Sequence, residues 1–308
     1  LGSAAVTGPV TAAFKAKYGI DLEVIGVTGA VGLERVKSEH AGQKYIADTL
    51  DGTPPALLQA KEAGMLVPLA DLPALQEKDK WTTSPILDPE KFIISMTPNV
   101  LAPYVNTQMV KAGDEPKSFT DFLDPKWKSR KIIISPPKIT SAMYYAYLSL
   151  VRNNILTDDY FTKVGKQEFF LTPNIQDSNA ALARGDAPLH FSAATSFMAP
   201  LFGRGAPVKP LVMKEGTIYF QANTMTVLAK APHPNAAKLF VNWMASKEGQ
   251  EAFHKAQGDM SYRKDVTNFT PQALQVEPKK VLALPFEMVL ETDKLTRQNF
   301  LDKMWGLD

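Results

Sequence analysis

The sequence has 308 residues, of which 45% are hydrophobic and 21% charged, and its formal net charge is +2. This is an ordinary globular composition, and at roughly 100–200 residues per domain the length predicts two domains. The nearly balanced, dispersed charge argues against a nucleic-acid-binding protein, and the lack of cysteine excludes disulfides, thiolate metal sites and cysteine nucleophiles.

The N-terminal part predicts a helix followed by a strand. Residues 10–14 carry a short apolar stripe at helical spacing, and residues 22–25 alternate as in a strand. No window reaches the roughly 20 consecutive apolar residues of a membrane span, and no signal peptide is visible at Leu1. Because an α/β fold is expected to open with a strand, we expect the first strand to precede residue 1.

Strands alternate with helices in the middle of the chain. The apolar run "KIIIS" at 131–135 predicts a strand, and the residues "TSAMYYAYLSLVRNN" predict the helix that follows it. The stretch "DSNAALARG" at 177–185 predicts a helix with Asp177 as its N-cap and Gly185 just past its end. The stretch "APLHFS" at 187–192 predicts the next strand.

The last third of the chain continues this alternation. A long strand is predicted at 217–230, followed by an amphipathic helix, a second helical piece capped by Ser246 and a last helix at 292–305. The alternation favours an α/β fold with a mostly parallel sheet. No Gly/Ser linker is present, so the extended stretches at 99–107 and 218–227 are predicted to pass between the domains as hinge strands.

Several stretches carry a resemblance to a known family. They are "SFTDFLDPKWKSRKIIISPP" at 118–137, "APHPNAAKLFVNWMASKEGQEAF" at 231–253, "SYRKDV" at 261–266, and "VKSEHAGQKYIAD" followed by "AGMLVPL" at 63–69. Together they resemble the periplasmic solute-binding proteins of ABC importers, in the branch that binds ferric ion, thiamine, phosphonates and sugar phosphates. The resemblance covers nearly the whole chain but says little about the ligand.

The resemblance implies a type II binding protein, in which two α/β lobes are joined by two crossing hinge strands and close on a solute held between them. The lobes would comprise residues 1–100 plus 225–270 and residues 107–222 plus 275–308. It further implies a periplasmic monomer that delivers a small-molecule solute to an ABC permease and ATPase complex. A periplasmic protein is expected to carry a signal peptide, which would precede residue 1.

The stretch "GVTGAVG" at 26–32 raises the question of a phosphate loop. It lacks the Lys-Ser or Lys-Thr of a P-loop, and its glycine spacing differs from that of a dinucleotide-binding loop. A simpler reading is that Thr28 caps the next helix, whose free N–H groups and small residues would let an anion approach. A tight turn that binds nothing remains the alternative.

Open α/β sheets bind ligands beyond the carboxyl ends of their strands, so the strand-to-helix junctions are candidate ligand sites. Hydroxyls recur there, and they both donate and accept hydrogen bonds, which suits a small oxyanion or polyol. Each of these residues alone also suits a plain N-cap. The candidate ligand-binding residues are Gly2, Ser3, Thr28, Gly29, Gly52, Thr53, Ser135, Thr140, Ser141, Tyr144, Ser192, Thr195, Ser196, Tyr219 and Gln221.

A metal site is not expected. Ferric-binding relatives supply a histidine or equivalent, an acidic residue and two adjacent tyrosines, and the resemblance places neutral hydroxyls at these positions: Ser3, Thr53, Thr195 and Ser196. The adjacent Tyr144 and Tyr145 lie inside a predicted helix, where they point about 100° apart and are interpreted mainly as packing. The four histidines have no ligand spacing, and His190 is interpreted as structural.

An enzyme is also not expected, because the sequence has no G-x-S-x-G or H-E-x-x-H motif and its carboxylates are scattered. No cofactor is predicted. The leading hypothesis is a binding protein for a small organic anion, namely a phosphonate, phosphate ester or carboxylate. The alternatives are a protein that binds ferric ion, another cation or a polyamine, and the ligand-sensing domain of a receptor.

Overall fold

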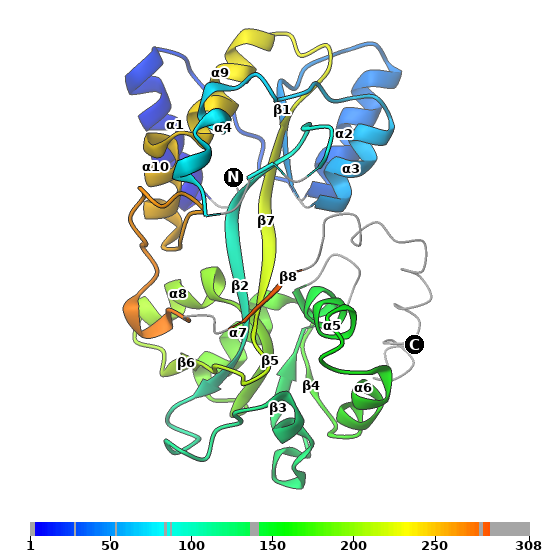
Figure 1. Cartoon of the computed structure of the whole chain (residues 1–308), viewed down its shortest axis with the longest axis vertical. Coiled ribbons are helices and arrows are strands. Elements are labelled where there is room, and N and C mark those ends of the chain that lie inside the picture. The colour runs from blue at the N-terminus through cyan, green and yellow to red at the C-terminus, as the bar shows by residue number, and fades with distance from the viewer. Residues whose placement is uncertain are drawn as a thin grey trace. The chain divides into compact units, whose positions relative to one another are not determined.

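The computed structural model of the chain (Figure 1) describes residues 4–27, 29–52, 54–82, 85–86, 88–135, 142–276 and 280–283. Contacts divide the chain into two units. Unit 1 comprises the described residues up to Pro98 together with Gln221–Phe269, and unit 2 comprises Asn99–Phe220 together with the described residues from Thr270 onward. The strands β2 (Ile94–Asn106) and β7 (Thr217–Val227) therefore each have residues in both units.

Unit 1 has its core where its first helix meets two helices from much later in the chain. Its elements are α1 (Ala4–Tyr18), α2 (Gly29–Ala41), β1 (Thr49–Gly52), α3 (Pro54–Glu62), α4 (Pro73–Gln76), a 3₁₀ turn at Lys78–Lys80, α9 (Pro234–Ala245) and α10 (Lys247–Gln257). The ring of Phe14 in α1 lies 5.1 Å from that of Phe240 and 5.3 Å from that of Trp243, measured between centroids. The helix predicted around residues 10–14 is therefore confirmed, and its stripe is buried.

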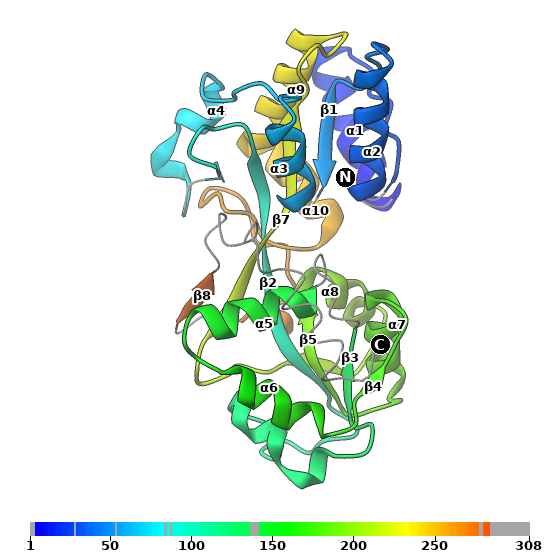
Figure 2. The same cartoon turned by 90° about the vertical axis from the view of Figure 1, so that its right-hand side faces the viewer.

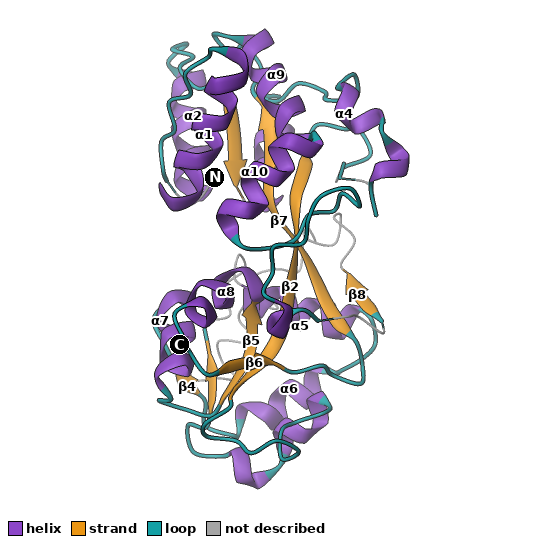
Figure 3. Ribbon diagram, turned by 90° about the vertical axis from the view of Figure 1, so that its left-hand side faces the viewer, coloured by secondary structure: helices purple, strands orange, loops and turns teal. Residues whose placement is uncertain are grey.

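Unit 2 is built on a sheet with helices packed on both faces (Figure 3). Its strands besides parts of β2 and β7 are β3 (Ile132–Ile134), β4 (Phe170–Leu171), β5 (Leu189–Ala194), β6 (Val208–Pro210) and β8 (Val281–Ala283). Its helices are α5 (Ala142–Arg152), α6 (Asp158–Gly165), α7 (Ile175–Arg184) and α8 (Thr195–Gly203), with 3₁₀ turns at Phe119–Leu123, Pro125–Trp127 and Gln272–Leu274. The strand β3 lies between β4 and β5 and is parallel to both, and β5 also pairs antiparallel with β2.

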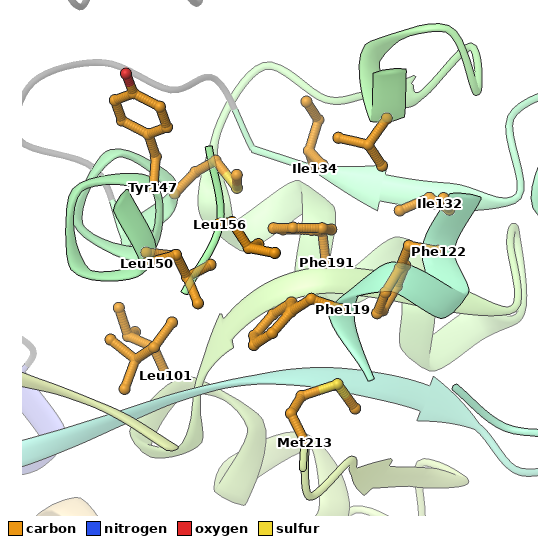
Figure 4. Close-up of a cluster of buried hydrophobic side chains, with 14 of the residues drawn as sticks. Leu101, Phe119, Phe122, Ile132, Ile134, Tyr147, Leu150, Leu156, Phe191 and Met213 are labelled. Carbon is orange, nitrogen blue, oxygen red and sulfur yellow. The ribbon is translucent and has the colours of Figure 1, made fainter. Parts of the chain in front are cut away.

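The three isoleucines of β3 show how the sequence fixes this sheet. Ile132 and Ile134 lie in a core with α5 and α6 (Figure 2), whereas Ile133 lies in the core with α7 and α8. Successive side chains of a strand point to opposite faces, so a run of apolar residues fills both cores at once. Figure 4 shows the first core, where Phe119, Phe122 and Phe191 pack beside Ile132 and Ile134.

Two predictions about the strands are wrong. The sheet is mixed rather than mostly parallel, because β7 runs antiparallel to β1 and β2 runs antiparallel to β5 and β6. The strand predicted at 22–25 does not form, and Val24 and Ile25 are 36% and 48% exposed. Alternation produces a strand only where a neighbouring strand pairs with its backbone, and none of the described residues pairs with this stretch.

The helix termini confirm some predicted caps and correct another. Ser246 caps α10 by accepting a hydrogen bond from the backbone N–H of Gly249, as predicted, and Gly185 ends α7 in the left-handed conformation. The N-cap of α7 is Asn174, however, and not Asp177, whose backbone N–H donates to Asn174 Oδ1 at 2.8 Å. Both residue types are good N-caps, and the helix begins at the earlier one. The helix predicted at 292–305 lies outside the described residues.

A bulge interrupts the pairing of β2 with β5 just before β5 ends. Ala102 pairs with Ala193 and Tyr104 with His190, so two steps along β2 match three steps along β5. Pro103 lies inside this interval. Proline has no N–H to donate to a neighbouring strand, and a bulge is one of the few places where a sheet accepts it. The bulge therefore lies close to the turn from β5 into α8.

His190 is completely buried in β5. Its Nδ1 accepts a hydrogen bond from the backbone N–H of Ser192 at 3.2 Å, and its Nε2 has no partner among the described residues. Burial disfavours the charged imidazolium and lowers the pKa of this side chain to about 3. The structural interpretation of His190 agrees with this environment.

Gly249 is expected to tolerate no side chain. A Cβ at this position would lie 2.0 Å from the carbonyl oxygen of Trp243, which is backbone and cannot move aside cheaply. Gly249→Ala should lower the free energy of unfolding by roughly 2–3 kcal/mol, measured by urea denaturation. Gly203→Ala in α8 is the control, because nothing lies within 4 Å of its Cβ position and the loss should be absent. Equal stability of the two variants would contradict this account of the α9–α10 junction.

The burial of His190 predicts a specific dependence of stability on pH. The unfolded state takes up a proton near pH 6.5, whereas the folded state does so only near pH 3, so acid favours unfolding between these values. The stabilisation is complete above pH 6.5 and falls by about 2 kcal/mol between pH 7 and pH 5. His190→Asn keeps an acceptor for the Ser192 N–H but does not titrate. Between pH 7 and pH 5 its free energy of unfolding should therefore fall by about 2 kcal/mol less than that of the wild type. Parallel curves for the two proteins would show that His190 is protonated in the folded state.

Candidate functional site

The predicted ligand-binding residues divide into those that the structure describes and those that it does not. Gly2, Ser3, Thr28, Thr53, Thr140 and Ser141 lie outside the described residues. Gly29 is the first residue of α2, and Gln221 lies in β7. In unit 1, Gly52 ends β1 two residues before Pro54 begins α3, and its carbonyl oxygen accepts a hydrogen bond from Thr224 Oγ1 at 2.8 Å.

In unit 2, two predicted serines lie at the same end of neighbouring strands. β3 and β5 are parallel, with Ile133 paired to His190. Each serine lies two residues beyond this pair: Ser135 directly follows β3, and Ser192 lies within β5 near its end. The carboxyl ends of adjacent parallel strands meet at one edge of a sheet. The structure thus brings these two hydroxyls to one edge of the unit 2 sheet.

Neither of these hydroxyls has a hydrogen-bond partner in the described part of the chain. Ser135 and Ser192 are each 2% exposed, and the Oγ atom of each is buried and unpaired. Leaving a buried polar group unpaired costs about 1–3 kcal/mol, so native proteins usually keep such groups for a ligand, a water molecule or a catalytic role. The two hydroxyls are therefore candidate contacts for a bound molecule or a water.

The helix that follows β5 starts without a side-chain cap. The N-cap of α8 is Ala194, whose methyl group cannot accept a hydrogen bond, whereas Asn174 and Ser246 cap α7 and α10. The first two residues of α8, Thr195 and Ser196, are only 6% and 7% exposed. Helix N-termini carry partial positive charge, and one that is buried without a cap is a natural place for an anion.

The hydroxyls of Thr195 and Ser196 each make one hydrogen bond inside unit 2. Tyr104 Oη donates to Thr195 Oγ1 at 3.0 Å, and Ser196 Oγ donates to Asn99 Oδ1 at 3.1 Å. Both partners come from β2 and were not among the predicted site residues. The only signal in the sequence was their position as polar residues in the apolar run "NVLAPYVNT", which was interpreted as a hinge strand.

The two predicted tyrosines have different surroundings. Tyr144 is 2% exposed in the α5 core, with its ring centroid 6.2 Å from that of Tyr147, which fits its interpretation as a packing residue. Tyr219 in β7 is half-buried, and burial raises the pKa of its phenol. Burial also raises the pKa of Tyr145, which opposes the tyrosinate form that a ferric ion requires. Among the described residues, no group of three or more His, Cys, Asp or Glu side chains could hold a metal ion.

The sequence is similar to known bacterial proteins along most of its length. Residues 10–280 match the family described as bacterial extracellular solute-binding protein. An uncharacterised protein of Haemophilus influenzae is 27% identical over 304 residues, covering 92% of this chain and 82% of that protein. Within the described residues, no helix is both long and apolar enough to cross a membrane.

Solved structures share the fold. The periplasmic binding protein AfuA of Actinobacillus pleuropneumoniae, with fructose-6-phosphate bound, has a TM-score of 0.76 at 24% identity and covers 100% of this chain and 97% of its own. Iron-bound HitA of Pseudomonas aeruginosa has a TM-score of 0.76 at 19% identity, and the match covers 98% of this chain and 96% of HitA. The ferric binding protein of Campylobacter jejuni has a TM-score of 0.78 at 16% identity, and the match covers 99% of this chain and 97% of that protein. Since the family match spans most of the chain, the protein belongs to the bacterial extracellular solute-binding proteins and has the two-lobed type II fold of periplasmic binding proteins.

Proposed function

We propose that this protein captures a small organic anion, namely a phosphonate, a phosphate ester or a carboxylate, at the unit 2 site and delivers it to an ABC permease. The observation that carries the proposal is the pair of buried hydroxyls of Ser135 and Ser192, which have no partner among the described residues, together with the uncapped start of α8, which follows β5 directly. An oxyanion would accept hydrogen bonds from both hydroxyls and from the helix N–H groups. It would also be stabilised by the partial positive charge of the helix terminus.

A ferric ion fits this chemistry less well. Hard cations prefer anionic oxygen ligands, whereas the described site offers neutral hydroxyls and a helix end that repels cations. AfuA, with its bound sugar phosphate, and iron-bound HitA share this fold equally well, so the choice between ligands depends on the site residues. The neutral donors of unit 2 favour the organic anion.

The remaining parts of the proposal follow the family. As an extracellular solute-binding protein, the chain would work in the periplasm as a monomer and meet a permease and ATPase complex. No chemical step is assigned to it, because the unit 2 site combines hydrogen-bond donors without an activated nucleophile or an acid/base pair. Binding and release of the solute would be its whole activity.

The unpaired hydroxyl of Ser192 predicts opposite effects on stability and on binding. Ser192→Ala removes a buried polar atom that has no partner in the described part of the chain, so the ligand-free protein should be equally stable or more stable by up to about 1 kcal/mol. The same variant should bind a phosphate ester about tenfold more weakly, because it loses a hydrogen bond to a charged oxygen. Urea denaturation and calorimetric titration with fructose 6-phosphate measure the two effects.

Ser178→Ala is the matched control. Ser178 is also buried in unit 2, but its hydroxyl donates to the Ile175 carbonyl oxygen at 2.8 Å, so the variant should lose about 1 kcal/mol of stability and keep its affinity. Wild-type protein at 100 times the dissociation constant should gain about 2.7 kcal/mol from the ligand. Stabilisation by polyamines or ferric citrate but by no anion would refute the proposed function.

A further inference from the structure

Each hydroxyl at the start of α8 makes one hydrogen bond to a described residue of β2. Thr195 Oγ1 accepts from Tyr104, and no described residue accepts the proton of Thr195 itself. Ser196 Oγ has the opposite arrangement, because its proton is donated to Asn99 and its lone pairs remain open. A hydroxyl has one proton and two acceptor lone pairs, so Thr195 keeps its proton to donate together with one lone pair, whereas Ser196 can only accept.

The two partners are held firmly enough to keep these directions. Tyr104 is completely buried, and burial raises the pKa of its phenol, so the group remains protonated and continues to donate. Asn99 is 6% exposed. Both residues lie in β2, and the register of β2 with β5 fixes their position along the strand relative to the start of α8.

We propose that Tyr104 and Asn99 are positioning residues that set the hydrogen-bonding direction of the solute site, with Thr195 as a donor to the solute and Ser196 as an acceptor from it. This inference rests on the proposed function, since it concerns the same unit 2 site. It narrows the solute to a molecule that offers an anionic oxygen to Thr195 and a hydroxyl proton to Ser196. A phosphorylated polyol meets both requirements, whereas a simple alkyl phosphate meets only the first.

The test compares two probes of similar size and charge, fructose 6-phosphate and hexyl phosphate, of which the second lacks hydroxyls. The preference is the ratio of their dissociation constants, measured by calorimetry. In Asn99→Leu the Ser196 proton is free to turn toward the phosphate group, so the preference for the hydroxylated probe should fall about tenfold. The affinity for hexyl phosphate should stay the same or improve.

Asn99→Asp is the conservative variant, because its side chain has nearly the same shape and keeps an acceptor for the Ser196 proton. Its negative charge should lower the affinity for both probes by a similar factor, so the preference should stay as in the wild type. Ser196→Ala removes the acceptor without touching β2, so it should lose the preference even if Asn99→Leu folds poorly. Circular dichroism and a thermal melt establish that each variant is folded.

Tyr104→Phe tests the other half of the arrangement. In this variant nothing holds Thr195 as a donor to the phosphate group that both probes carry. The affinity for each probe should therefore fall by roughly threefold to tenfold, and the preference should not change. A different pattern for the Asn99 and Tyr104 variants is the result expected here. A purely structural role would give the same pattern for both.

The outcomes separate this inference from the proposed function. If the wild type binds neither probe but binds a phosphonate or a carboxylate, the inference is overturned and the anion-binding function stands. If it binds no organic anion at all, both are refuted. If the wild type binds both probes, and Asn99→Leu or Ser196→Ala lowers the affinity for both by equal factors, the anion-binding function stands. The assignment of Thr195 as donor and Ser196 as acceptor is then overturned. A selective loss for fructose 6-phosphate in these two variants, with the preference retained in Asn99→Asp, supports it.

Discussion

The parallel pairing of β3 with β5 determines where the polar residues of unit 2 lie. Ile132 and Ile134 fill one core and Ile133 the other, so a shift of this strand by one residue would exchange the two sets. With the register fixed by apolar packing, the strands must end at the same edge of the sheet. Ser135 and Ser192 reach that edge because of where the isoleucines are buried, and no interaction between the serines is needed to place them.

The same sheet also prepares the start of α8. The bulge at Pro103 and the end of β5 bring Thr195 and Ser196 beside Tyr104 and Asn99 of β2, which use one hydrogen-bonding capacity of each hydroxyl. The hydroxyl groups are therefore oriented before a solute arrives, and binding costs less side-chain entropy. Ser135 and Ser192 differ from this pair, because their hydroxyls have both capacities open in the described structure.

Much of the fold could be predicted from local patterns. Ser246 and Gly185 are caps whose chemistry can be recognised in the sequence, and the "KIIIS" strand is recognisable from its apolar run. Strand direction and pairing depend on distant residues, so the mixed sheet and the missing strand at 22–25 could not be predicted in this way. For the site, the hydroxyls at strand ends were visible, but the contact of Tyr104 with Thr195 joins residues 91 positions apart. Local sequence contains no signal for such a pair.

The core of unit 1 joins residues from opposite ends of a long stretch of chain. Phe14 of α1 packs against Phe240 and Trp243, while all of Asn99–Phe220 belongs to unit 2. A ribosome releases the chain from its N-terminus, so α1 waits for its partners until unit 2 residues 99–220 and then α9 have emerged. Unit 1 therefore cannot finish folding before most of the protein has been synthesised, whereas the residues of unit 2 between 99 and 220 emerge as one continuous stretch.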